Sequence, residues 1–285
     1  MAIYLSLLFH STASAADPHP GFLFAIERFY QDEFESPSAI SVDKKNNEIY
    51  VADSVRNEIL IFDSSGKPLF KFGKEQGLSS PQDVLVRDNK IYVIQAGKDY
   101  LQVFNYRGEP IKRVAPEGIP FSPGRMNTDG EGNLYVTDAA QGACLVFDKD
   151  DKLSMTIGRG IHSIAGVAAS KDRIYLLTPV SQYAIHVYDR KGNFIISFGL
   201  TGEEGDSLGL PTAIQTDNFG LLWVADALQG VAVLTGNGKR LLTSAPYGKA
   251  KGQVYFPIDI DMDGKGNVYL LEKAVKRVSV FKVDR

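Results

Sequence analysis

One pattern recurs along most of the 285 residues and limits the fold more than any other feature. Short runs of β-branched and aromatic residues, bounded by Asp, Asn, Ser and Gly, predict antiparallel strands. The clearest copy, residues 37–63 (PSAISVDKKNNEIYVADSVRNEILIFD), predicts three strands, and residues 67–72 predict a fourth. Aligned on the aromatic residue of the second strand, six copies follow one another at spacings of 42, 43, 40, 48 and 46 residues: Tyr50, Tyr92, Tyr135, Tyr175, Trp223 and Tyr269. Four-strand repeats of this length predict a β-propeller, because one such sheet cannot bury both of its faces alone.

The two ends of the chain complete each other. The sixth copy begins at Pro257 and has room for three strands before Arg285. Residues 21–36 (GFLFAIERFYQDEFES) resemble a fourth strand and an interblade link, yet no three strands precede them. Pairing the termini in one blade would remove two exposed sheet edges. The expected fold is all-β, a single six-bladed β-propeller over residues 21–285, built of four-stranded antiparallel blades, the last closed by the N-terminal strand.

Residues 1–15 (MAIYLSLLFHSTASA) differ from the rest. An apolar run at residues 3–9 precedes a small-x-small site at Ala13-Ser14-Ala15. This pattern predicts a signal peptide, although no Lys or Arg precedes the apolar run. We therefore expect a periplasmic or extracellular protein with no transmembrane segment once the signal is removed.

Charge and cysteine content narrow the possible partners. The formal net charge is −3, and basic loop residues alternate with acidic ones, which argues against nucleic acid and suits a protein partner. The one cysteine, Cys144, lies in an apolar strand and is predicted to be a core residue. A monomer is expected.

Two turns, residues 129–133 (DGEGN) and 263–267 (DGKGN), share residue types with calcium loops. An EF-hand loop needs more ligands, a glutamate twelve residues along and flanking helices. Both segments are therefore predicted to be hairpin turns.

The repeat resembles a known family. A leading proline, a turn with Gly and Asn, a Tyr-Val-x-Asp strand end and a Val-Phe-Asp-x-x-Gly segment are similar to the NHL repeat, best in residues 37–66, 123–148 and 211–238. The fourth copy departs most, with Ile164 for the proline and Thr178-Pro179 for the aspartate. The resemblance implies a six-bladed ring with a central channel. The family and related folds include binding propellers, a zinc lyase and calcium-dependent lactonases, so the fold does not choose the function.

Candidate binding residues come from two rings of positions near the predicted channel mouth. One ring follows each second strand, and the other lies two residues after each leading proline. With nearby loop residues, the candidates are Asp53, Arg56, Asp83, Gln95, Arg125, Asp138, Tyr183, Asp226, Gln229, Asp259 and Glu272. Gln95, Arg125, Thr178 and Glu272 break the repeat, which favours a functional role. Asp53, Asp138 and Asp226 occupy a repeated position, so capping of the following loop is the favoured interpretation for these three.

Two functional hypotheses follow. The favoured one is a non-catalytic binding or assembly module without cofactor, whose partner is an exported protein or a cell-envelope component. The alternative is a calcium-dependent hydrolase or lactonase with ligands among Asp53, Asp138, Asp226, Asp259 and Glu272. Only His10, His19, His162 and His186 are available as histidine ligands, so a three-histidine zinc site is not expected, and no catalytic residue is assigned.

Overall fold

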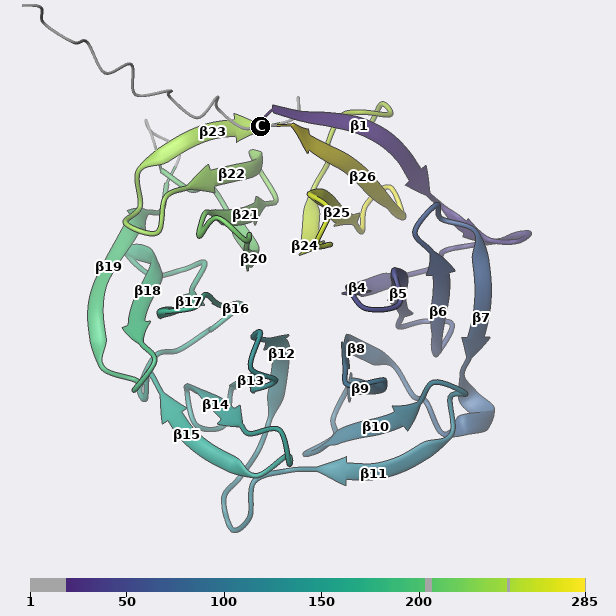
Figure 1. Ribbon diagram of the computed structural model, residues 1–285, viewed down its shortest axis with the longest axis horizontal. Coiled ribbons are helices and arrows are strands. Elements are labelled where there is room, and N and C mark those ends of the chain that lie inside the picture. Colours follow the sequence, from purple (N-terminus) through teal and green to yellow (C-terminus); the bar gives the residue numbers. More distant parts are fainter. Residues whose placement is uncertain (1–18, 203–206, 245–246, 285) are drawn as a thin grey trace, which may run out of the picture.

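The computed structural model describes residues 19–202, 207–244 and 247–284, and shows a closed ring of six antiparallel sheets (Figure 1). The predicted signal peptide lies outside these residues. The described part of the chain has no helix of the length and apolar character needed to cross a membrane. The all-β, six-bladed prediction is confirmed.

Each blade contains four strands that follow one another from the channel to the rim. The first three blades are β4 (Pro37–Asp43), β5 (Glu48–Asp53), β6 (Glu58–Asp63) and β7 (Pro68–Phe72); β8 (Pro81–Arg87), β9 (Lys90–Gln95), β10 (Leu101–Asn105) and β11 (Pro110–Val114); β12 (Pro123–Thr128), β13 (Leu134–Asp138), β14 (Ala143–Phe147) and β15 (Leu153–Ile157). The next two are β16 (Gly166–Ala169), β17 (Arg173–Leu177), β18 (Tyr183–Asp189) and β19 (Phe194–Leu200); β20 (Pro211–Thr216), β21 (Leu222–Asp226), β22 (Gly230–Leu234) and β23 (Arg240–Ser244).

The sixth blade joins the two ends of the chain, as predicted. It contains β24 (Pro257–Met262), β25 (Asn267–Glu272), β26 (Arg277–Asp284) and, at the rim, β1 (His19–Ile26). Phe22 pairs with Phe281, and their rings also meet edge to face. The expected interblade link instead carries a small hairpin, β2 (Arg28–Phe29) and β3 (Asp32–Glu33), whose Phe29 packs on Phe62.

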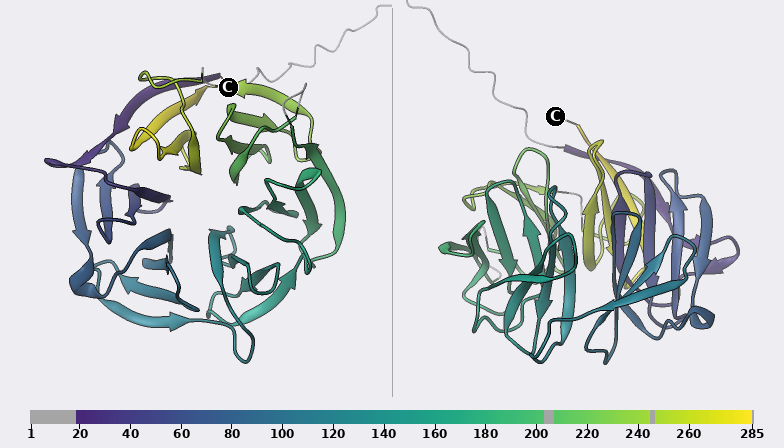
Figure 2. Two further views of the ribbon diagram at one scale, coloured as in Figure 1. Left: turned by 180° about the vertical axis from the view of Figure 1, so that it is seen from behind. Right: turned by 60° about the horizontal axis from the view of Figure 1, so that its bottom comes forward.

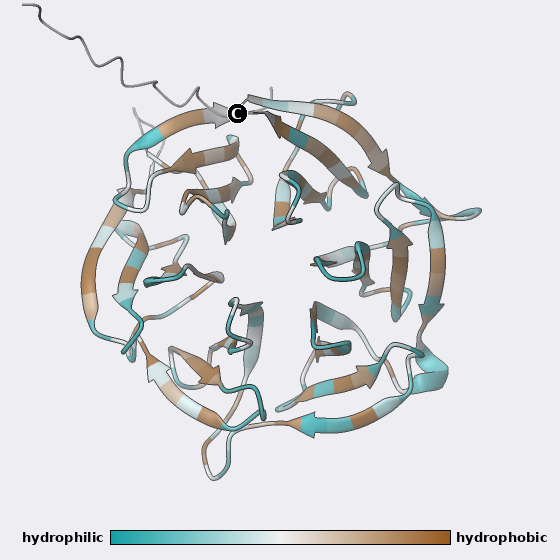
Figure 3. Ribbon diagram, viewed as in Figure 1, coloured by the Kyte–Doolittle hydropathy of each residue, from teal (hydrophilic) through white to brown (hydrophobic). Residues whose placement is uncertain are grey.

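The hydrophobic core lies between neighbouring blades rather than in one central mass. Each of six buried clusters joins two adjacent blades, for example Tyr50 and Ile61 with Val84 and Phe104. Figure 3 shows apolar residues along the strands and hydrophilic ones at the turns. Cys144 is fully buried in one cluster, where burial raises the pKa of its thiol to about 12, so the predicted core role is confirmed. Full burial of one large apolar side chain in these clusters, such as Phe104, stabilises the fold by about 1.5–3 kcal/mol.

The ring has two faces with different connections (Figure 2). One side carries the turns that join the first strand of each blade to the second and the third strand to the fourth; we call it the turn face. The other side, with the loops between second and third strands and the links between blades, is the loop face.

On the turn face, side chains cross from one blade to the next. Asp151, from blade 3, contacts Arg87 and Tyr92 of blade 2. Arg190 of blade 4 forms a similar ion pair with Asp129 of blade 3. Asp129 Oδ2 also accepts a hydrogen bond from the hydroxyl of Tyr135 at 2.9 Å. Two of the aromatic residues that define the repeat, Tyr92 and Tyr135, therefore bond to carboxylates of these turns.

Candidate functional site

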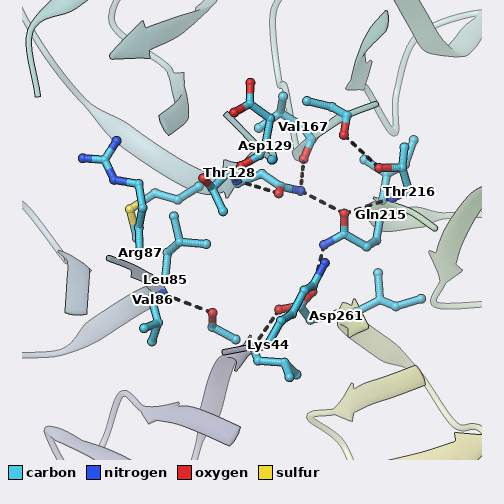
Figure 4. A pocket seen from close by; sticks show the side chains of 18 of the residues that line it. Lys44, Leu85, Val86, Arg87, Thr128, Asp129, Val167, Gln215, Thr216 and Asp261 are labelled. Atoms are coloured by element: carbon cyan, nitrogen blue, oxygen red, sulfur yellow. Dashed lines mark hydrogen bonds between the residues drawn. The ribbon is translucent and has the colours of Figure 1, made fainter. Parts of the chain in front are cut away.

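A cavity of about 840 Å³ occupies the central channel. It is lined by the first strands of all six blades, β4, β8, β12, β16, β20 and β24, and by the turns that follow them. Because those turns form its rim, the cavity opens on the turn face. Figure 4 shows this cavity with ten of its lining residues labelled.

The wall of the channel is made of strand edges whose backbone N–H groups would otherwise lack partners. Side chains from the preceding blade accept several of these hydrogens. The donor–acceptor pairs are Ile40 N–Asp259 Oδ2 at 2.9 Å, Val42 N–Asp261 Oδ2 at 2.7 Å, Val86 N–Ser41 Oγ at 3.2 Å and Met126 N–Asp83 Oδ2 at 2.6 Å. The buried carboxylates of the channel therefore also hold neighbouring blades together.

Arg125 crosses the channel near the loop face. Its Nη1 atom donates to the carbonyl oxygen of Ser38 at 3.2 Å. The same atom lies 3.6 Å from Asp83 Oδ1 and 3.8 Å from Asp259 Oδ2. Four blades thus meet at one guanidinium, which forms the inner end of the cavity and keeps 25% of its side chain exposed.

The carboxyl groups beside Arg125 have unusual acidity. Burial raises the pKa of Asp83 to about 7, against the lowering effect of Arg125. Burial also raises the pKa of Asp259. A group that gains and loses a proton near neutral pH, next to a permanently charged guanidinium, is typical of acid–base sites.

A second polar layer lies closer to the turn face. Gln215 donates to Asp261 Oδ1 at 2.9 Å, and Asn127 donates to the Val167 carbonyl at 2.7 Å. Burial raises the pKa of Asp261, and Lys44 partly offsets this rise. Figure 4 labels both residues in the cavity wall. None of these residues was a sequence-based candidate, although Asp261 and Asn127 lie two positions beyond the candidates Asp259 and Arg125 on the same strands. Side chains two residues apart on a strand point to the same face, so the positions two residues further along each first strand would have identified them.

The aspartates that end three of the second strands are buried and cap the interblade links. Asp53 accepts the backbone N–H groups of Glu35 and Ser36 at 2.7 and 3.0 Å. Asp226 accepts four N–H groups, including those of Gly209 and Leu210 at 2.7 and 3.0 Å. Asp138 accepts those of Ser122 and Ala140, also through Oδ1. The capping predicted for these three residues is confirmed.

Two residues that break the repeat perform the same task. Gln95 Oε1 accepts the N–H of Ser79 at 2.6 Å, and Glu272 Oε2 accepts that of Tyr255 at 2.6 Å. Glu272 also pairs with Arg277 at 2.8 Å. Both side chains are buried, so their departure from aspartate preserves the link rather than presenting a free group.

The remaining candidates are spread over the loop face. Arg56 donates through Nε to the Glu33 carbonyl, and Gln229 donates through Nε2 to the carbonyl of Ser207. Tyr183 is exposed on blade 4. The structure therefore brings together Asp83, Arg125 and Asp259 in the channel, and distributes the other eight candidates over all six blades.

The residues do not fit the calcium site of the alternative hypothesis. Asp53, Asp138, Asp226 and Glu272 already accept backbone hydrogens, and the guanidinium of Arg125 stands beside Asp259. Among residues 19–202, 207–244 and 247–284, no three His, Cys, Asp or Glu side chains are grouped to hold a metal ion. The carboxylates of Asp129 and Asp263 accept N–H groups of their own turns, which confirms the predicted hairpins.

Comparisons with known proteins place the fold. Solved structures that match include a gluconolactonase from Xanthomonas campestris (14% identity, 95% of this chain and 96% of that chain, TM-score 0.68). A luciferin-regenerating enzyme matches at 15% identity over 93% and 95% of the two chains, TM-score 0.66. Virginiamycin B lyase from Staphylococcus aureus matches at 12% over 92% and 99%, TM-score 0.65. At these identities the likeness concerns the fold.

Sequence comparison adds one local match. No curated protein sequence matches the chain. The model of the NHL repeat matches residues 34–62, which contain β4, β5 and most of β6. This match and the six-bladed ring together show that the chain resembles NHL-repeat propeller proteins.

Proposed function

We propose that this propeller is an enzyme that hydrolyses a small polar ester or lactone in its channel without a metal. The observation that carries the proposal is the group of Asp83, Arg125 and Asp259 at the inner end of a cavity that opens on one face. A concave site with a few converging polar groups and shifted pKa values is the usual form of a small-molecule site.

The chemistry follows from the charges. The guanidinium of Arg125 would donate to the carbonyl oxygen of the substrate and stabilise the negative charge that develops there. The carboxylate form of Asp83 or Asp259 would take a proton from the attacking water, and return it to the departing alkoxide as the ester C–O bond breaks. A pKa of about 7 at Asp83 makes both forms available near neutral pH.

The fold neighbours support the enzymatic interpretation over a purely structural ring. Their names describe a gluconolactonase, a lyase and a regenerating enzyme, and each extends over more than nine tenths of this chain. We propose no calcium step, because Arg125 takes the place beside the channel carboxylates.

The proposal is tested with a panel of lactones and esters, assayed with and without a chelator, and with elemental analysis of the purified chain. Asp83→Asn and Arg125→Lys should each lower kcat/KM by about 100-fold or more. Asp172→Asn, an exposed carboxylate at the cavity rim, is the control and should stay within about threefold of wild type. Calcium-dependent activity, or full activity in Asp83→Asn, would overturn the proposal.

A second candidate function is docking of an exported protein or cell-envelope component on the loop face. It is favoured by large apolar side chains exposed there from several blades: Val55, Val180, Tyr183, Leu228, Tyr247 and Phe256. Large apolar side chains exposed on one face are candidates for contact with a partner. The predicted signal peptide would deliver the chain to the compartment of such a partner.

Docking is tested by capture of partners from a cell-envelope fraction. Val180→Ser with Leu228→Ser should abolish capture of any specific partner. The matched control is Phe219→Ser, since Phe219 is as exposed as Val180 but lies on the turn face. Equal capture by both variants would exclude the loop face.

A further inference from the structure

Blade 4 departs from the repeat at the position that follows the second strand. Thr178 stands where the other blades have a carboxylate or amide that accepts the link N–H groups. Here the link is held by backbone alone, with Ala165 N donating to the Leu177 carbonyl at 2.8 Å. The side chain of Thr178 is therefore available for another partner.

That partner is a histidine on the next strand. Thr178 Oγ1 lies 2.9 Å from His186 Nε2, and His186 Nδ1 lies 2.8 Å from Ser197 Oγ. His186 and Ser197 are directly opposed on β18 and β19, so the sheet itself fixes their separation. The result is a chain of three polar side chains across three consecutive strands and their loop.

We assign the hydrogens from the contacts of Thr178. Its hydroxyl can donate to the Tyr183 carbonyl, which lies 3.2 Å away. With the hydrogen placed there, Thr178 accepts from His186 Nε2–H, and the Nδ1 lone pair accepts from Ser197. Nucleophile, base and orienting group thus stand in the order that activates serine hydroxyls.

The surroundings support this assignment. Burial lowers the pKa of His186, so the ring is neutral at neutral pH and one ring nitrogen keeps a free lone pair. Thr178 is buried, whereas His186 and Ser197 are half-buried and can be reached from solvent. Ser197 lies on β19, the outermost strand of blade 4, far from the channel side of the sheet (Figure 1).

We propose that Ser197 is an activated nucleophile that accepts the acyl group of activated esters or thioesters, with His186 as its base and Thr178 as a positioning residue. In this step Ser197 Oγ bonds to the acyl carbon and its proton passes to His186 Nδ1. The acyl carbon's bond to the alkoxide or thiolate then breaks, and the leaving group takes that proton.

The test is labelling of the full chain with a fluorophosphonate, which reacts with activated serines and releases fluoride, followed by peptide mass spectrometry. We expect modification of Ser197 but not of Ser154, an outer-strand serine of blade 3 whose hydroxyl donates to the Val146 carbonyl. A p-nitrophenyl acetate burst, absent in Ser197→Ala, provides a second readout.

Variants separate activation from structure. His186→Gln should slow labelling by about 100-fold or more. Thr178→Val, which removes only the hydroxyl acceptor, should slow it by about tenfold, and Thr178→Ser should restore it. Arg125→Lys should leave labelling unchanged, which distinguishes this site from the channel. Equal labelling of Ser154 and Ser197, or full labelling in a folded His186→Gln, would overturn the proposal.

Discussion

The two faces of the ring hold it together by different means. On the turn face, charged side chains from one blade are buried in the next, as Asp151 is against Arg87 and Tyr92. On the loop face, each carboxylate accepts hydrogens from the link that enters its own blade, as Asp226 does. Turn-face contacts therefore couple neighbouring blades, and loop-face contacts fix where each blade begins.

The largest expected effect concerns the turn face. Asp151→Ala would leave the guanidinium of Arg87, of which 3% is exposed, without its carboxylate. An uncompensated buried charge costs about 3–5 kcal/mol, so the free energy of unfolding should fall by that amount in urea titration. Lys112→Ala removes the half-exposed partner of the same carboxylate and should cost less than about 1 kcal/mol. Equal losses for the two variants would contradict a buried interblade pair.

On the loop face, the cost should follow the number of capped hydrogens. Asp226→Ala leaves four N–H groups without their acceptor and should lower the unfolding free energy by about 2–4 kcal/mol. Asp138→Ala should cost less, because only one oxygen of Asp138 is used and its Oδ2 has no partner. A reversed order would show that burial, rather than capping, decides the loss.

The raised pKa of Asp83 should add a pH dependence from the channel. The pKa of Asp83 is raised from 3.8 to about 7 on folding, so the folded state holds a proton that the unfolded state has lost between these values. Stability should consequently fall as pH rises from about 4 to about 7. The melting temperature of Asp83→Asn should change less over this pH range than that of wild type. An identical slope would show that Asp83 is ionised throughout.

The smallest effect should come from one turn-face hydroxyl. Tyr135→Phe removes the 2.9 Å bond to Asp129 and should cost about 1 kcal/mol in urea titration. Tyr106→Phe, at an exposed tyrosine, is its control and should be neutral. A neutral Tyr135→Phe would limit the turn-face coupling to its charged pairs.

Much of the fold was predictable because its determinants are local. The Asp-Gly-Asn turns, the aromatic residue of each second strand and the short final copy are all local sequence signals, and they predicted six blades and the closing strand. The hairpin at residues 28–33 was missed, since its Arg-Phe and Asp-Glu strands are two residues each and carry no alternation.

The candidate site was less predictable because it depends on contacts between blades. Arg125 departs visibly from the repeat, but its contact with Ser38 and Asp259 depends on ring geometry across the channel. Conversely, Gln95 and Glu272 also depart from the repeat and still cap links, so deviation alone does not mark a free functional group. Thr178, His186 and Ser197 have no common sequence motif, because only strand register brings them together.

The pairing of β1 with β26 also determines when the ring can close during synthesis. Phe22 leaves the ribosome long before its partner Phe281, which follows it roughly 260 positions later. At about 5–20 residues per second, the first strand waits on the order of 10–50 s without its sheet. During that time this uncharged segment, HPGFLFAI, exposes unpaired backbone groups that another unfolded chain could pair with. Blades 1 to 5 can each form as they emerge, so we expect the pairing of β1 with β26 to follow them.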